Sequence, residues 1–209
     1  MKRICICVPS MEFVTAGFAQ SLAELSFNSL GMKDTLIATI FEVGSLIYEA
    51  RNNLVKKALR DMGADFLLWL DSDMIFKPDT LIKLLDHDAD FVSGLYFRRS
   101  PPYAPVVFSE VDMDRREWKG LNKIPEKTFE AEAVGFGCAL VKAEVFADVA
   151  VKFRNWFEPM NGFGEDLAFC WRARQCGYKI LVDPDIECGH YAHMIVDSRI
   201  YKAFNKGLQ

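Results

Sequence analysis

The 209-residue sequence predicts an α/β fold in which a mostly parallel central sheet is flanked by helices. Three observations support this prediction. Short, continuously apolar segments of strand length recur along the chain, as expected of strands that are buried on both faces of a sheet. Longer segments, in which apolar residues recur at helical spacing, lie between them. The two kinds of segment alternate, which is typical of βαβ units with parallel strands.

The first strand is predicted at residues 4–8, where an apolar run is followed by Pro9 and Ser10. The first helix is predicted at residues 45–62, because apolar side chains recur there every four residues. Gly63 follows this segment, and glycine is the residue type that most often ends a helix.

A second helix and two more strands complete the βαβαβ pattern. Residues 66–70 form a short, continuously apolar segment, which predicts a strand buried on both faces. The Pro-Asp-Thr sequence at residues 78–80 is typical of a helix start, and three leucines follow it. Residues 91–96 are predicted to form the next strand.

The second half of the chain begins with a segment of a different character. Residues 98–128 combine four prolines with many charges, so we expect loops there. Residues 112–123 contain Trp118 as their only large aromatic and are expected to be mobile. The tail from Ile195 shows no clear pattern. The elements predicted between these segments are strands near 129–134, at 138–142 and at 178–182, and a helix at about 165–176 that Gly177 ends.

The composition is that of an ordinary globular protein and argues against some classes of partner. The formal net charge of -4 gives no basic footprint for nucleic acid or for an anionic membrane. The apolar run at residues 4–8 is too short for the core of a signal peptide. No apolar stretch approaches the roughly 18 residues of a membrane span. We therefore expect a single cytoplasmic domain over residues 1–209, large enough to bury a full core.

The six cysteines fit that compartment. No C-x-x-C sequence occurs, and the cysteine density is below that of a secreted disulfide scaffold. Cys5, Cys7 and Cys138 lie in apolar strand segments and are interpreted as small buried hydrophobes. The alternative is a zinc site, although the spacing of its ligands fits no zinc-finger pattern. Those ligands would be Cys170, Cys176, Cys188 and His190.

The segment FLLWLDSDMIF, residues 66–76, places two aspartates at the end of a buried strand, where open α/β sheets bind ligands. Asp71 and Asp73 are two positions apart, so in an extended chain their side chains converge. Converging carboxylates resist ionising unless a cation lies between them. A hard divalent ion resolves this conflict, and such ions commonly bind phosphates. The alternative is a turn in which each acid caps a backbone amide; the apolar flanks favour the metal.

Four motifs, in the same order, resemble the GT-A-fold glycosyltransferases, particularly the family-two-like group. In the first, ARNNLVKKALRDMGADFLLWLDSDMIFKPDTLIKLL, an Arg-Asn helix precedes a strand that ends in D-x-D. The others are AVGFGCALVKAEVF, FGEDLAFCWRARQCGYKILVDP with its Glu-Asp pair, and CGHYAH. The resemblance covers roughly residues 3–193 and implies a Rossmann-like GT-A fold. Its nucleotide-sugar-binding half would be residues 1–97 and its acceptor-side half residues 98–194, followed by a tail at 195–209.

The resemblance also implies a set of site residues. A metal ion, Mn2+ or Mg2+, would be bound by Asp73 and His190 with Asp71 close by, and we favour His190 over His193 as the ligand. Asp166 would be the general base, with Glu165 beside it as a second catalytic residue. The residues implied in binding the donor and its metal are Pro9, Ser10, Arg51, Asn52, Asp71, Ser72, Asp73, Gly135 and Gly137.

Each of these residues also has a purely structural interpretation. Arg51 and Asn52 would be polar faces of a surface helix. Glu165 and Asp166 would be acids favoured by the dipole in the first turn of a helix. The glycines at 135 and 137 would form a β-bulge rather than let a sugar approach the backbone. The late histidines would be surface residues with ordinary partners.

The sequence therefore predicts a metal-dependent glycosyltransferase. It would move a sugar from a nucleoside-diphosphate sugar, with a UDP-sugar favoured, to a hydroxyl of a glycan, lipid or protein acceptor. The resemblance favours inversion at the anomeric carbon. One alternative is a GT-A-like nucleotidyltransferase, which usually has a Gly-rich, basic loop after the first strand that VPSMEFVTAGF lacks. The other is a non-catalytic carbohydrate- or partner-binding domain of the same fold, against which the intact motifs argue.

Overall fold

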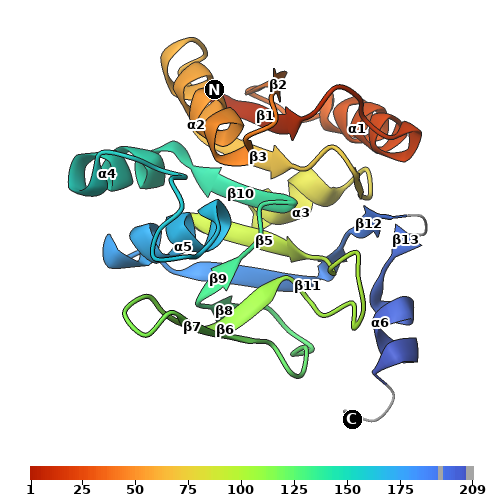
Figure 1. The fold of residues 1–209 in the computed structure, drawn as a ribbon. Coiled ribbons are helices and arrows are strands. Elements are labelled where there is room, and N and C mark those ends of the chain that lie inside the picture. Colours follow the sequence, from red (N-terminus) through yellow and green to blue (C-terminus); the bar gives the residue numbers. More distant parts are fainter. Residues whose placement is uncertain (193–194, 206–209) are drawn as a thin grey trace.

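A seven-stranded sheet forms the middle layer of the structure (Figure 1). The computed structural model describes residues 1–192 and 195–205. The strands of the sheet are β1 Lys2–Ser10, β2 Thr35–Val43, β3 Phe66–Leu70, β5 Phe91–Leu95, β8 Phe129–Ala131, β10 Cys138–Lys142 and β11 Ile180–Glu187. Their order is β2-β1-β3-β10-β5-β11-β8. All run in one direction except β10 and β8, so the predicted α/β class with a mostly parallel sheet is confirmed.

Helices cover both faces of this sheet, because successive residues of a strand point to opposite sides. They are α1 Ala16–Ser29, α2 Ile47–Arg60, α3 Thr80–Asp86, α4 Ala143–Phe153 and α5 Glu165–Gln175. Cys7 and Trp69 pack on one face with α2, α4 and α5, whereas Ile6 and Leu68 pack on the other with α1 and α3. The buried positions predicted for Cys5, Cys7 and Cys138 are confirmed.

Strand β1 is longer than the predicted 4–8 and includes Pro9 and Ser10. Its pairing with β2 continues to Ser10, but its pairing with β3 ends at Cys7. Pro9 therefore lies where β1 has a neighbour on one side only, a position that tolerates a residue without an N–H group. Beyond Cys7 the two strands are no longer paired, and the last residues of β1 border the site described below.

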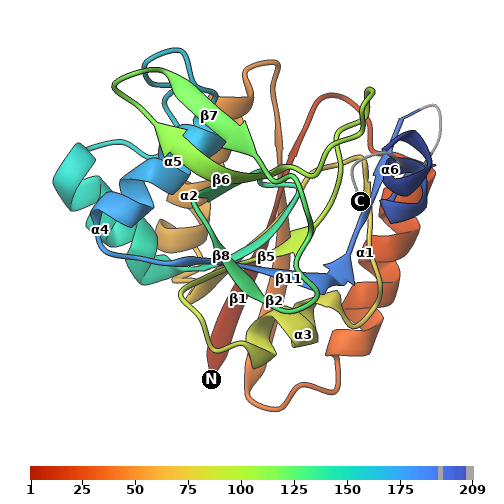
Figure 2. The same ribbon diagram turned by 90° about the horizontal axis from the view of Figure 1, so that it is seen from below.

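A β-hairpin occupies part of the segment for which we expected only loops. Strands β6 Val107–Asp112 and β7 Glu117–Gly120 pair with each other, and β9 Ala133–Val134 adds a third strand. Figure 2 shows β6 and β7 as a twisted ribbon in front of α5. Asp112 organises the turn by accepting hydrogen bonds from the N–H groups of Asp114 and Arg115. The expectation of loops is wrong here, and the mobility of residues 112–123 stays a prediction.

The tail from Ile195 also has structure. Strand β13 Ile195–Val196 forms a small sheet with β12 Gly189–Tyr191 and β4 Met74–Ile75, and helix α6 Ser198–Phe204 follows. Asp197 caps α6 by accepting from two of its N–H groups. Tyr201 of α6 stacks on Phe97 at 5.3 Å, so the helix is held near the end of β5.

Helices α1 and α4 and strand β2 lie outside the segments predicted from the sequence. Thr15 starts α1 by accepting a hydrogen bond from the Phe18 N–H. Strand β2 is an edge strand and is only partly buried, so its alternating pattern is weak. Among the described helices, none combines the length and the apolar character needed to cross a membrane.

Candidate active site

A cleft of about 500 Å³ lies at the carboxyl ends of β1, β3 and β5. This is the edge at which open α/β sheets bind their ligands. The cleft brings together residues that are far apart in the sequence and come from both predicted halves of the chain. Of the predicted site residues, those that line it are Pro9, Ser10, Arg51, Asp71, Ser72, Asp73, Glu165, Asp166 and His190.

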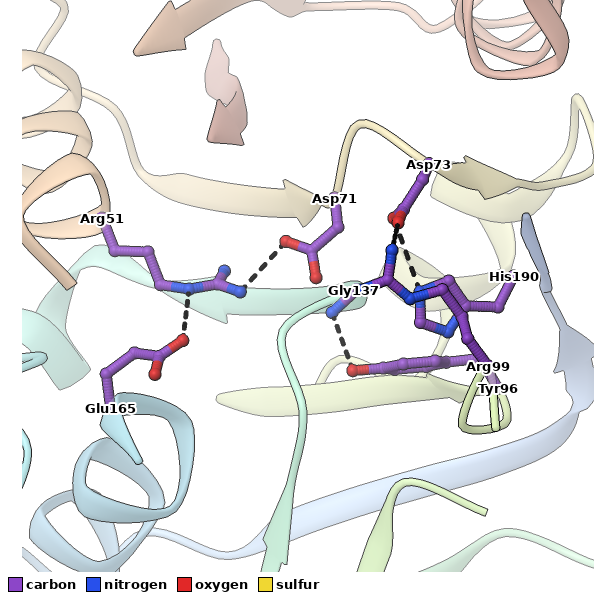
Figure 3. A network of polar contacts seen from close by, with 8 residues as sticks. All are labelled: Arg51, Asp71, Asp73, Tyr96, Arg99, Gly137, Glu165 and His190. Carbon is purple, nitrogen blue, oxygen red and sulfur yellow. Dashed lines mark hydrogen bonds and ion pairs between the residues drawn. The ribbon is translucent and has the colours of Figure 1, made fainter. Parts of the chain in front are cut away.

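Arg51 joins two of the predicted carboxylates (Figure 3). Its Nη2 atom lies 3.0 Å from Asp71 Oδ1, and its Nε atom lies 3.3 Å from Glu165 Oε1. The residue is only 3% exposed, and its guanidinium also lies 5.4 Å from the ring centre of Phe136. A buried cation of this kind needs paired acids around it. Arg51 therefore ties α2, the end of β3 and the start of α5 together.

Asp71 and Asp73 do not converge as predicted for an extended chain. The Met74 N–H donates to the Asp71 carbonyl at 3.0 Å, so residues 71–74 form a turn instead. Asp71 points to Arg51, whereas Asp73 points away from it, to Arg99 and His190 (Figure 3). The backbone therefore forms the turn of the alternative interpretation. The two carboxylates, however, pair with Arg51 and Arg99 rather than mainly with backbone amides.

Burial governs the ionisation of the cleft's acids. Burial raises the pKa of Asp71 above its ordinary value, although the nearby Arg51 opposes the shift. Burial, and after it the neighbouring charge of Glu165, raises the pKa of Asp166 to about 6. Burial also acts on Asp73, but His190 and Arg99 outweigh it and hold the pKa of Asp73 below its ordinary value. The cleft therefore contains carboxyl groups with different proton affinities.

The His190 ring is oriented so that one nitrogen faces Asp73. His190 Nδ1 lies 2.8 Å from the Phe97 carbonyl oxygen, which can only accept, so Nδ1 must carry a hydrogen. In the neutral ring, Nε2 then presents a lone pair, 3.5 Å from Asp73 Oδ1. Two acceptors that face each other need a proton or a cation between them. A backbone carbonyl that fixes the tautomer in this way is a common feature of metal-binding histidines.

The residues present fit a divalent ion with two protein ligands. Among the described residues, no group of three or more His, Cys, Asp or Glu side chains converges in a way that could hold a metal. The pair of Asp73 and His190 therefore requires further ligands from a substrate or from water, as is usual for Mg2+ bound with phosphates. Asp71, predicted as a third ligand, is engaged by Arg51. His193 lies outside the described residues.

The zinc alternative has no support from the buried cysteines. Cys170 is fully buried, and its Sγ donates to the Val134 carbonyl oxygen at 3.4 Å. Cys188 is also fully buried and has Cys138 as its hydrogen-bond partner. In the described part of the chain these thiols belong to the core.

Asn52 is not in the cleft. Its Nδ2 donates to Glu158 Oε1 at 3.0 Å, and its Oδ1 accepts from the Phe157 N–H at 3.1 Å. These bonds fix the loop between α4 and α5 on α2. Asn52 therefore supports the positions of the residues around Arg51, and its side chain is engaged outside the cleft in which the donor contact was predicted.

Gly135 and Gly137 accommodate Tyr96. A Cβ atom at Gly135 would lie 1.9 Å from the Tyr96 hydroxyl oxygen, and one at Gly137 would lie 2.8 Å from Tyr96 Cζ. The Gly137 N–H donates to the same hydroxyl at 3.1 Å. Neither glycine lines the cleft, whereas Tyr96 does. The glycines thus make room for an aromatic side chain rather than for a sugar.

We expect Gly135→Ala to lower the free energy of unfolding by about 1–3 kcal/mol, because the added methyl group would force the buried Tyr96 to move. Urea denaturation measures this change. Gly31→Ala is the matched control, since a Cβ there meets no atom within 4 Å, and it should change stability by less than about 0.5 kcal/mol. Equal stability of the two variants would contradict the packing described here.

Eight residues that line the cleft were not identified from the sequence, and three of them lie against predicted site residues: Tyr96, Arg99 and Phe136. Tyr96 ends the predicted strand 91–96 and Arg99 lies three residues later, so both are at the same edge of the sheet as Asp71. Their position in YFRRS was a usable signal. Phe136 lies between the two glycines, and only the packing of Arg51 on its ring reveals its place in the site.

Comparison with known proteins establishes the fold but no family. No protein-family model matches the chain, and no curated protein matches it. The structure of A197 from STIV is similar with a TM-score of 0.63 and 17% identity, covering 92% of this chain and 86% of that one. The structure of GalNAc-T7 with UDP, GalNAc and Mn2+ is similar with a TM-score of 0.59 and 11% identity. That match covers 99% of this chain and 48% of GalNAc-T7, so the chain spans about half of its length. The chain therefore has a glycosyltransferase-like α/β fold.

Proposed function

We propose that this protein is a metal-dependent glycosyltransferase that uses a nucleoside-diphosphate sugar, with UDP-sugars favoured, and transfers the sugar with inversion to an acceptor hydroxyl. One observation supports this proposal most. Asp73 and His190, which can offer a metal an oxygen and a nitrogen ligand, lie at one end of the cleft. The acidic start of α5, with Glu165, lies at the other end (Figure 3). A metal-fitting pair and an acid–base group on either side of one cleft suit the two substrates of a transfer reaction.

The donor would bind along the edge formed by β1 and β3. Pro9 and Ser10, at the end of β1, would contact the base and ribose. Asp73 and His190 would hold the divalent ion, which supplies Lewis-acid neutralisation of the diphosphate charge when bound. Arg51, expected from the sequence to contact the nucleotide, is instead assigned to holding Asp71 and Glu165 in place, because both contacts are already made within the protein.

Asp166 would be the general base. Its pKa of about 6 leaves it mostly ionised at neutral pH, yet basic enough to accept a proton from an attacking hydroxyl. Its Oδ1 accepts from the Leu167 N–H at 2.8 Å, which fixes the carboxyl group at the start of α5. Glu165 is engaged by Arg51, so it is the less suitable base of the pair. The proton would pass from the acceptor hydroxyl to Asp166 as the oxygen attacks the anomeric carbon, while the bond from that carbon to the diphosphate oxygen breaks and the nucleoside diphosphate leaves with the bonding electrons.

The fold neighbour GalNAc-T7 supports the choice of substrate class. Its structure was determined with UDP, GalNAc and Mn2+, which are a nucleoside diphosphate, a sugar and a divalent ion. The motifs that resemble GT-A glycosyltransferases lie around the cleft of this chain. The proposal is tested by measuring thermal stabilisation with UDP-, GDP- and TDP-sugars, each with and without Mn2+. Stabilisation by none of them would refute it.

We expect His190→Ala to weaken Mn2+ binding by about tenfold or more, since even residues that only orient metal ligands contribute about 10–100-fold. Binding of Mn2+ is measured by electron paramagnetic resonance in the absence of nucleotide. His87→Ala is the control, because His87 is paired with Asp183 at 2.7 Å and does not line the cleft. Unchanged Mn2+ affinity in His190→Ala would remove His190 from the metal site.

A further inference from the structure

Arg99 already neutralises the carboxylate that the proposed metal would use. Its Nη1 atom lies 2.8 Å from Asp73 Oδ2, while His190 faces the other oxygen, Oδ1. The Arg99 side chain is 58% exposed, in contrast to the buried Arg51. The two arginines of the cleft therefore differ in how closely the protein surrounds them. Figure 3 shows Arg51 on the Asp71 side of the cleft and Arg99 beside Asp73 and His190.

The backbone next to Arg99 is anchored independently of the cleft. The Arg98 N–H donates to the Ala104 carbonyl at 2.9 Å. The Arg98 guanidinium lies 5.2 Å from the ring centre of Trp118, on the β6–β7 hairpin. Consecutive arginines thus have separate tasks: Arg98 attaches the segment to the hairpin, and Arg99 extends into the cleft. A movement of the Arg99 side chain would not require the backbone to leave its place.

A divalent ion on Asp73 would compete directly with this arginine. Both would use the same carboxylate, and a double positive charge a few ångströms from a guanidinium repels it. A diphosphate that arrives with the ion offers the displaced guanidinium a better partner, because arginine makes paired, charge-assisted hydrogen bonds to phosphate oxygens. The exposed position of Arg99 makes this exchange sterically simple.

We propose that Arg99 is an exchange cation: it neutralises Asp73 when no metal is bound, and it passes to the donor's diphosphate when the metal and donor bind. This inference rests on the proposed function. It makes Arg99 a residue that binds the diphosphate and would help the leaving group carry its charge. It also predicts that removing Arg99 has opposite effects on the two ligands of the site.

The test is Arg99→Ala, measured with Mn2+ alone and then with UDP at saturating Mn2+. Affinity for Mn2+ alone should rise about two- to fivefold, the range that an exposed ion pair contributes, because the competing cation is gone. Affinity for UDP should fall about tenfold, because a charge-assisted contact is lost. Titrations by electron paramagnetic resonance and calorimetry, at one ionic strength, measure the two quantities.

Arg115→Ala is the matched control, since it removes the same charge from an exposed side chain whose one ion pair among the described residues is with Asp112 of its own turn. It should change neither affinity. If Arg99→Ala binds both Mn2+ and UDP more weakly, Arg99 only maintains the shape of the site. That result would overturn the proposed exchange. Unchanged Mn2+ affinity, or UDP binding that needs Arg99 but no metal, would also overturn it. Absence of Mn2+ binding in the wild-type protein would instead refute the metal site, and the exchange with it.

Discussion

Asp166→Asn is expected to lower the rate of sugar transfer by about 10²–10⁴-fold, while the affinity for UDP changes only a few-fold. Asparagine has nearly the same shape as aspartate but cannot accept the proton of the acceptor hydroxyl. The hydrogen bond of Asp166 is to the Leu167 N–H, and Asp73 pairs with His190, so donor binding at that pair should survive the change. The measurement is the single-turnover rate with a UDP-sugar that stabilises the protein, alongside UDP affinity by calorimetry.

The pH dependence of transfer provides an independent check on Asp166. The base form is required, and the pKa of Asp166 is raised to about 6. The rate should therefore be constant above this pH and fall about tenfold for each unit below it. Asp166→Asn should lose this acidic limb altogether. A normal rate in Asp166→Asn would indicate another base or a retaining mechanism.

Glu165→Gln is the companion variant for the same experiment. Glutamine can keep a hydrogen bond at the position next to Arg51 but loses the charge, so a smaller effect on transfer is expected. Large and equal losses of UDP affinity in both variants would show that Glu165 and Asp166 build the nucleotide site. In that case the assignment of Asp166 as base would be wrong.

Arg51→Met is expected to lower the free energy of unfolding by about 3 kcal/mol at neutral pH, because two partly buried carboxylates lose their shared cation. Methionine fills similar volume among the aromatic rings, so the loss reflects charge more than packing. Urea denaturation measures the change. Arg115→Met, on an exposed arginine, should remain within about 0.5 kcal/mol of the wild type.

The effect of Arg51→Met should also depend on pH. The pKa of Asp71 is already raised by burial, and removing Arg51 removes the influence that opposes this shift. An acid whose pKa is higher in the folded than in the unfolded state stabilises the fold as pH falls through the folded pKa. The stability difference between Arg51→Met and the wild type should therefore narrow in mildly acidic solution. A difference that is the same at all pH values would show that charge is not its cause.

The sequence was sufficient where local pattern decides the structure. Strands β3 and β10 begin and end at the predicted residues, because each is a short apolar run in the middle of a buried sheet. The β6–β7 hairpin was missed because its stability comes from an aspartate-centred turn and from contacts across strands, such as Trp118 on Phe108 at 5.4 Å. Charged residues on such a hairpin look like a loop when pairing is unknown.

The sequence predicted the position of the site better than it predicted the contacts that its residues make. The motifs identified the correct edge of the sheet, since strand ends gather there. They could not distinguish Arg51, which points into the cleft, from its neighbour Asn52, which points to the loop near Phe157, because adjacent helical residues face directions about 100° apart. They also could not show that a turn separates Asp71 from Asp73, or that Arg99 lies on Asp73.

The antiparallel strand β10 has a consequence for the way the chain can fold. It lies between β3 and β5 and pairs with both, yet it follows them by many residues in the sequence. Within residues 1–97, β3 and β5 therefore have no direct pairing. During synthesis, β3 and β5 cannot be joined in one sheet until β10 has left the ribosome. Pairing β10 with both strands is a long-range step, and such steps slow folding. The cleft is completed later still, when α5 brings Glu165 to Arg51. A nascent chain that stalls before residue 138 would leave one edge of β3 unpaired and β5 without a partner strand, and exposed apolar strands of this kind are substrates for chaperones.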